Sequence, residues 1–131
     1  MKTFAAAAGM LLISPAAQAA EFCQFVRETV AKVEAGEVIE PSLNGPDGFS
    51  CEPEEAGEAY TCDRTGKGLD RTLEKKLADR IAACLGKSSE PSETGLGFIV
   101  KFSPHAVIGA YMLSYPAISS HGLTFSFEHK Y

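Results

Sequence analysis

The fold of this chain is decided by residues 69–86, LDRTLEKKLADRIAACLG. Apolar side chains recur there at three- and four-residue steps and charged side chains fill the remaining positions, which is typical of an amphipathic helix. Asp70 is a suitable N-cap, and Gly86 is a suitable stop because glycine reaches the left-handed conformation at little cost. We therefore expect a helix over residues 69–85 with one buried stripe, formed by Leu69, Leu73, Leu77, Ile81, Cys84 and Leu85.

The segments on either side of this helix complete an α+β pattern. A second amphipathic helix is predicted over residues 21–34, followed by two short strands, 49–52 and 59–63, that pair as a hairpin. A polar connector, 87–94, leads to three longer strands near 98–103, 106–115 and 123–131. In the last strand Leu123, Phe125 and Phe127 alternate with Thr124, Ser126 and Glu128, so the first three are expected to face inward and the others outward. The predicted fold is two helices packed on one face of an antiparallel sheet, in the order α-β-β-α-β-β-β.

The first nineteen residues have the pattern of a secretory signal peptide. Lys2 supplies the positive charge, residues 4–13 form a short apolar run, and Ala17-Gln18-Ala19 is a small-x-small cleavage site. The apolar run is too short to span a bilayer. We expect cleavage after Ala19, a single domain over residues 20–131, no membrane span after cleavage, and a periplasmic or secreted location.

The four cysteines all lie in this predicted mature domain. An even number of cysteines in an exported chain predicts disulfides, and no Cys-x-x-Cys pair is present to indicate zinc or redox chemistry. Three pairings are open. We favour Cys51 with Cys62, across the predicted hairpin, and Cys23 with Cys84, on the hypothesis that antiparallel helices bring the start of the first to the end of the second.

The charge of the chain indicates its class of partner. Twelve Lys and Arg face seventeen Asp and Glu, a formal net charge of −5, so nucleic acid is not an expected partner. Acidic residues gather between positions 28 and 58, where Lys32 is the one basic residue. Such a stretch is either a solvated loop or a surface that attracts a cationic protein or peptide of the cell envelope. The candidate binding residues are Glu52, Glu54, Glu55 and Glu58.

Catalytic motifs are not apparent in the sequence. His105, His121 and His129 form no local ligand pair, and residues 44–48 and 63–70 lack the full spacing of a calcium loop or a phosphate-binding loop. No metal or cofactor is therefore expected. The leading hypothesis is a non-enzymatic exported binding, inhibitor or envelope accessory module. The alternatives are a small periplasmic hydrolase that uses a histidine and a carboxylate, and a structural subunit that assembles through a sheet edge such as strand 106–115.

Overall fold

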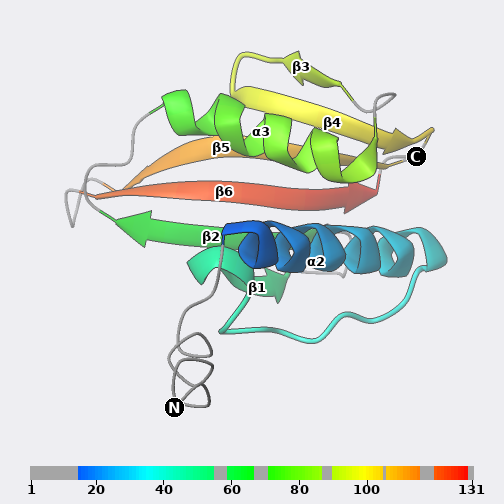
Figure 1. Cartoon of the computed structure of the whole chain (residues 1–131). Coiled ribbons are helices and arrows are strands. Elements are labelled where there is room, and N and C mark those ends of the chain that lie inside the picture. The colour runs from blue at the N-terminus through cyan, green and yellow to red at the C-terminus, as the bar shows by residue number, and fades with distance from the viewer. Residues whose placement is uncertain are drawn as a thin grey trace, which may run out of the picture.

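The computed structural model describes residues 15–54, 59–66, 71–86, 90–104, 106–115 and 120–129. Two helices, α2 (Pro15–Ala35) and α3 (Thr72–Leu85), lie on one face of a six-stranded antiparallel sheet (Figure 1). The predicted α+β class is confirmed. The sheet has the spatial order β1-β2-β6-β5-β4-β3, and a short 3-10 turn, η1 (Pro46–Gly48), precedes it in the chain. The strands are β1 (Ser50–Pro53), β2 (Ala59–Gly66), β3 (Pro91–Glu93), β4 (Gly97–Ser103), β5 (Ala106–Tyr115) and β6 (Ser120–His129).

The prediction missed one strand and the start of another. β3 lies inside the expected polar connector, because its sequence Pro-Ser-Glu has no apolar alternation to reveal it. β6 begins at Ser120 rather than Leu123, since its pairing with β5 continues to the Tyr115–Ser120 pair. The helix expected from residue 69 begins at Thr72 with Arg71 as its N-cap, and Asp70 lies outside the described residues.

Strand β5 is central, so the hypothesis that it is an assembly edge is wrong. It pairs with β4 on one side and with β6 on the other. The true edges are β1 and β3, and both are short. Ser42 bridges to Cys51 on the outer side of β1, while β3 has three residues and begins with a proline. Short, covered or proline-bearing edges resist pairing with another chain.

An aromatic cluster under α2 forms the centre of the core. The ring of Phe125 on β6 lies 5.7 Å from Phe22, 4.9 Å from Phe49 and 5.6 Å from Phe127, measured between centroids. The predicted inward face of β6 is therefore confirmed. Thr124 and Ser126, expected to face solvent on the other side, are buried instead. Strand β6 lies between β2 and β5, so side chains of both neighbours surround Thr124 and Ser126 on the face away from the helices. Alternation along one strand predicts which face a residue points to, but not how well its neighbours cover it.

The two disulfides are Cys23–Cys84 and Cys51–Cys62, as predicted. The second joins directly paired residues of β1 and β2. The reason given for the first was wrong, because both helices cross the sheet in the same direction (Figure 1). Cys23 lies within α2, which is displaced along the sheet so that this part of it meets the end of α3. Two disulfides are compatible with an oxidising compartment.

The start of α2 contributes little to the core. The helix begins at Pro15 rather than Glu21, and residues 17–21 are exposed, so contact with the core begins at Phe22. Cleavage after Ala19 would leave Phe22 and Cys23 in place. None of the described helices combines the length and the apolar character needed to cross a bilayer.

Candidate functional site

The two histidines whose backbone is described are far apart. His121 and His129 lie near opposite ends of the ten-residue strand β6, about 26 Å apart at roughly 3.3 Å per residue. His105 lies outside the described residues. His121 and His129 therefore do not share one site. In the described part of the chain, no group of three or more His, Cys, Asp or Glu side chains is placed to hold a metal ion.

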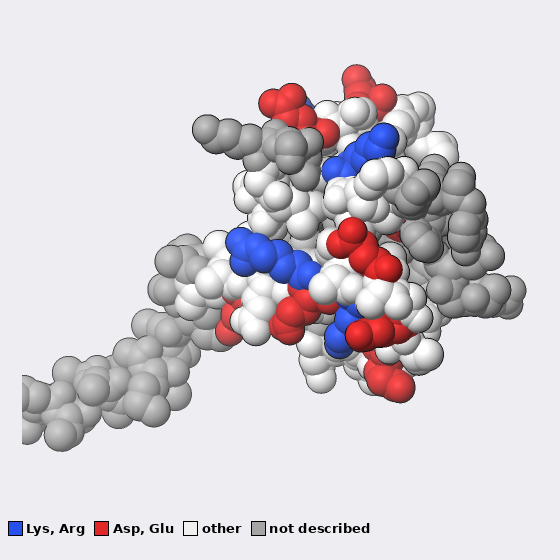
Figure 2. Space-filling view, turned by 90° about the vertical axis from the view of Figure 1, so that its right-hand side faces the viewer, with Lys and Arg blue, Asp and Glu red and all other residues white. Residues whose placement is uncertain are grey.

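Two of the four predicted acidic binding residues lie in the described part of the chain. Glu52 lies on β1 and Glu54 follows that strand, and both are exposed. Glu52 points to the sheet face opposite Cys51, because neighbouring strand residues alternate. Glu55 and Glu58 lie outside the described residues. Figure 2, which views the end of the molecule where α2 finishes, shows acidic side chains in several groups with basic side chains between them. The face shown in Figure 2 is therefore not one continuous acidic patch.

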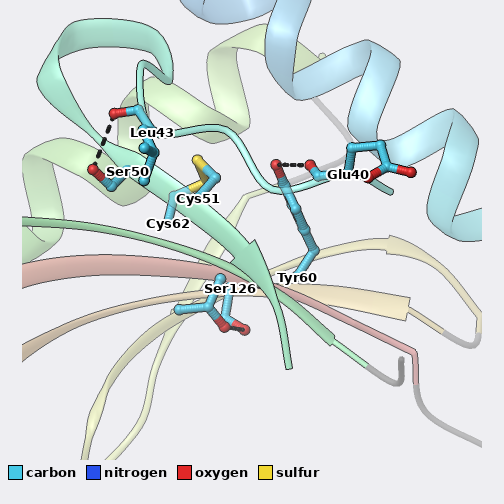
Figure 3. The surroundings of a disulfide bond; sticks show 8 residues. Glu40, Leu43, Ser50, Cys51, Tyr60, Cys62 and Ser126 are labelled. Carbon is cyan, nitrogen blue, oxygen red and sulfur yellow. Dashed lines mark hydrogen bonds between the residues drawn. A yellow bond between two sulfur atoms is a disulfide. The ribbon is translucent and has the colours of Figure 1, made fainter. Parts of the chain in front are cut away.

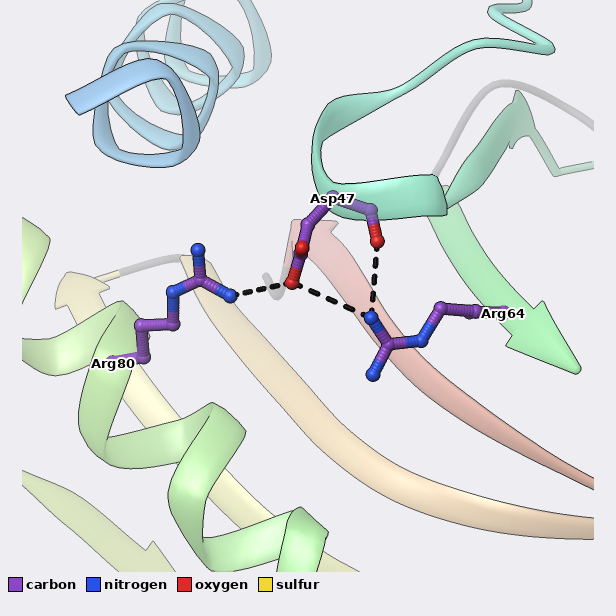
Figure 4. A network of polar contacts seen from close by, with 3 residues as sticks. All are labelled: Asp47, Arg64 and Arg80. Atoms are coloured by element: carbon purple, nitrogen blue, oxygen red, sulfur yellow. Dashed lines mark hydrogen bonds and ion pairs between the residues drawn. The ribbon is translucent and has the colours of Figure 1, made fainter. Parts of the chain in front are cut away.

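Asp47 is a structural anchor rather than a free acidic residue. Its carboxylate oxygen Oδ2 lies 2.7 Å from Nη1 of Arg80 and 3.4 Å from Nη1 of Arg64, which also donates to the Asp47 carbonyl at 3.0 Å (Figure 4). The Arg80 guanidinium lies 4.0 Å over the Phe22 ring, and that of Arg64 lies 5.0 Å over Phe49. The counter-charges of Asp47 thus come from outside the acidic stretch: two arginines, from β2 and α3, fix η1 against the core.

A small cavity of about 260 Å³ lies between the start of α3 and the turn joining β3 to β4. Its walls carry both signs of charge, with Arg71 and Lys75 beside Glu74 and Glu93. The Glu74 side chain is only 3 % exposed, and its Oε2 accepts a 2.9 Å hydrogen bond from the Met112 backbone N–H, while its Oε1 lies 3.3 Å from Arg71. Glu74 thus accepts the hydrogen bond of a β5 amide at a position where β4 has not yet begun. This is a structural role.

Residues 37–45, which we call the 37–45 segment, run over the surface between α2 and η1 in an extended course (Figure 1). The Tyr60 hydroxyl, reaching up from β2, donates a 3.1 Å hydrogen bond to the Glu40 carbonyl (Figure 3). Burial raises the pKa of Tyr60, which keeps this donor protonated. Further along, Ser42 and Cys51 exchange two backbone hydrogen bonds of 2.7 Å. The middle of the segment is therefore held at two points.

The far end of the 37–45 segment is held over the Cys51–Cys62 disulfide. Ser50 Oγ donates to the Leu43 carbonyl at 3.1 Å (Figure 3). Gly45 approaches so closely that an added Cβ would lie 2.6 Å from the Phe49 carbonyl oxygen and 3.0 Å from the Cys51 sulfur. A side chain at Gly45 would therefore displace the segment from the disulfide, and glycine is required by this close approach.

Although its backbone is held, the 37–45 segment exposes two large apolar side chains. Val38 is 89 % exposed and Leu43 83 %, while Ile39 between them packs against the core. Among the described residues the other large apolar side chain so exposed is Leu96, at 82 %, in the β3–β4 turn. Singly exposed apolar side chains are common on protein surfaces, but a side chain on a held backbone can be covered by a partner at little cost in conformational entropy.

The same segment is acidic. Glu34 at the end of α2, together with Glu37 and Glu40, is exposed and has no salt-bridge partner within the described part of the chain. Among the described residues these carboxylates are therefore not ion-paired as Asp47 is, and the basic residue nearest to them in sequence is Lys32 in the last turn of α2. The 37–45 segment thus presents Val38 and Leu43 in an acidic surround.

The sequence analysis missed Val38 and Leu43. The residues from 37 to 48 are rich in turn formers, which predicts a loop, and the most evident chemical feature of such a loop is its carboxylates. The available signal was an apolar pair, Val38-Ile39, inside an otherwise polar and acidic run. Such a pair indicates that one side chain packs inward, and its neighbour is then exposed in an extended chain.

Comparison of the chain with family models, with curated proteins and with solved structures finds no match.

Proposed function

We propose that the protein is an exported, non-enzymatic binding module that docks onto a cationic partner protein through the 37–45 segment. The observation that carries the proposal is the exposure of Val38 and Leu43 on a backbone held by Tyr60, Cys51 and Ser50. A fixed segment loses little conformational entropy on binding, so more of the contact energy appears as affinity. Unpaired carboxylates beside it favour a partner of opposite charge and accelerate the encounter.

The apolar contribution is large enough to measure. Replacing Val38 and Leu43 with alanine removes about two and three carbon atoms, or about 4 kcal/mol at ~0.8 kcal/mol per buried CH₂. That free energy corresponds to about a thousandfold weaker binding. Because both side chains are exposed in the free protein, the substitutions should leave the free energy of unfolding nearly unchanged.

The test is affinity capture from an envelope extract with the disulfide-bonded chain, followed by calorimetric titration of the purified partner. We expect a partner that the Val38→Ala/Leu43→Ala double variant does not retain. The matched control is Leu96→Ala, which removes an equally exposed leucine from another turn and should retain the partner.

A second arm tests the charge. Glu37→Gln/Glu40→Gln should slow association and flatten its salt dependence, because screening acts on exposed charges. Equal capture by the wild type and the alanine double variant, or equal loss in the Leu96 control, would refute the assignment of the 37–45 segment.

A further inference from the structure

We propose that the 37–45 segment covers the Cys51–Cys62 disulfide and controls its reduction by external thiols. The bond is reduced only from a form of the protein in which the segment has moved away, whereas the Cys23–Cys84 disulfide reacts in the closed fold. The segment then has a second role beside partner binding, as a regulator of thiol chemistry at one of the two disulfides.

The segment and the core enclose the Cys51–Cys62 disulfide from two sides. Both cysteines are almost fully buried. On the core side, Cys62 pairs with Phe125 of β6, the centre of the aromatic cluster. On the outer side, a Cβ built on Gly45 lies 3.0 Å from the Cys51 sulfur, and Figure 3 shows Cys51 pointing from β1 toward the segment. The gap between Gly45 and the sulfur is therefore too narrow for a reagent.

Reduction of a disulfide requires direct access to one of its sulfur atoms. A thiolate of an external dithiol attacks that sulfur, the S–S bond breaks, and the other cysteine leaves as a thiolate that takes a proton from water. The second thiolate of the reagent then displaces the mixed disulfide. The protein gains two electrons and the reagent is oxidised to its own disulfide. Because Gly45 lies against the Cys51 sulfur, the segment must move before the first of these steps.

The contacts that keep the segment closed are local. Ser42 and Cys51 exchange two backbone hydrogen bonds of 2.7 Å, and Ser50 Oγ donates to the Leu43 carbonyl at 3.1 Å. All of these contacts lie outside the aromatic cluster of the core. A local opening of this kind costs less free energy than global unfolding. The reduction rate of the covered bond is therefore set by the opening equilibrium of the segment.

The Cys23–Cys84 disulfide lacks this cover. It joins α2 to α3, and α3 and β1 lie on opposite sides of α2 (Figure 1). Cys23 is partly exposed, so an external thiolate reaches it without movement of the 37–45 segment. The two disulfides of one molecule thus provide an internal comparison. Global unfolding accelerates the reduction of both, whereas opening of the segment accelerates only that of Cys51–Cys62.

The cover also links occupancy of the segment to the redox state of the bond. A partner that binds the closed form stabilises it, and so slows reduction of Cys51–Cys62. By linkage, a reduced protein whose segment is open binds that partner less tightly by the same factor. This consequence rests on the proposed function, whereas reduction of the free protein depends on the cover alone.

The test is timed reduction of the free, disulfide-bonded protein with dithiothreitol at mildly alkaline pH. Thiols released at each time are alkylated and located by peptide mass spectrometry, and rates are taken from the early part of the reaction. We expect Cys23–Cys84 to be reduced at least about tenfold faster than Cys51–Cys62, because the covered bond waits for a local opening.

Two variants open the segment by different means. Gly45→Ala pushes the segment off the sulfur, and Ser50→Ala releases the Leu43 carbonyl without adding bulk. Gly45→Ala should accelerate reduction of the covered disulfide by about tenfold, and Ser50→Ala by a smaller factor, while the rate of the other disulfide stays within about twofold. The matched control is Gly95→Ala, in open space, which should change neither rate.

Hydrogen exchange of the Ser42 amide gives a second readout of the same opening. This amide donates to the Cys51 carbonyl, so Gly45→Ala should raise its exchange rate by the same factor as the reduction rate. Equal reduction rates of the two disulfides in the wild type would overturn the proposal. So would a Gly45→Ala or Ser50→Ala variant in which both rates rise together, as expected of general destabilisation, or in which neither rises. Partner capture does not enter this experiment, so the cover and the proposed function can fail separately.

Discussion

The two disulfides should differ in their contribution to stability, and the difference can be calculated. Cys23–Cys84 closes a sequence separation of 61 residues and Cys51–Cys62 one of 11. In the chain-entropy description, a disulfide destabilises the unfolded chain more when its loop is longer. The expected contributions are about 4.3 and about 2.8 kcal/mol at 25 °C. Replacing Cys23 and Cys84 with alanine should therefore cost about 1.5 kcal/mol more than replacing Cys51 and Cys62.

Packing predicts the opposite order, which makes the comparison informative. Cys51 and Cys62 are almost fully buried beside the aromatic cluster, whereas Cys23 is partly exposed. If lost core contacts dominated, removal of the Cys51–Cys62 pair would be the more damaging change. The assay is urea unfolding of the two double-alanine variants. The denaturant slope m must be measured for each variant, because loss of a disulfide lets the unfolded chain expose more surface and so changes m. A larger loss for the Cys51–Cys62 variant would refute the entropic reasoning.

Three further predictions concern the sheet. Because burial raises the pKa of Tyr60, the contribution of Tyr60 to the free energy of unfolding is complete below about pH 10 and falls at higher pH, where the unfolded chain ionises first. Tyr60→Phe should reduce this alkaline loss in urea titrations from about pH 8 to 11. An identical dependence on pH in the variant and the wild type would contradict the prediction. Thr124 is fully buried and its hydroxyl has no hydrogen-bond partner within the described residues, so Thr124→Val should raise the free energy of unfolding by about 1–3 kcal/mol in thermal melts. At Gly97 an added Cβ would collide with the Ala110 carbonyl, so Gly97→Ala should destabilise by about 3 kcal/mol, whereas Gly95→Ala, in open space, should not.

Local periodicity was sufficient for most of the fold. The stripe of α3 is confirmed at Leu77, Ile81 and Cys84, which are all buried. The same helix also buries Glu74, which periodicity assigned to the solvent side. Glu74 is buried where β4 has not yet begun opposite β5, so that Met112, which pairs with β6 on its other side, has no partner on β4 and its amide donates to Glu74. Such a requirement arises from strand register, which the pattern of a single helix does not encode.

Pairings between distant segments were less predictable. The Cys51–Cys62 disulfide follows from a local hairpin, so adjacency in sequence was enough to predict it. The Cys23–Cys84 pairing was correct although the helices are parallel, because α2 is displaced along the sheet and this brings Cys23 to the end of α3. The arginine pair on Asp47 was not predicted at all, since both arginines come from elements that reach η1 only in the folded chain.

The positions of the two disulfides also explain why the 37–45 segment is held although its composition predicts a loop. Each disulfide fixes one flank of the segment: Cys23–Cys84 anchors α2 before it, and Cys51–Cys62 anchors β1 after it. Composition identified this region as a loop, and loops are ordinarily the most mobile parts of a domain. Between two cross-linked elements, with Tyr60 and Ser50 holding its carbonyls, the same composition instead gives a fixed surface. Val38 and Leu43 are then exposed to water, which is unfavourable for apolar side chains, and the held backbone gives no conformational entropy in return. A partner that covers both side chains would remove this unfavourable exposure.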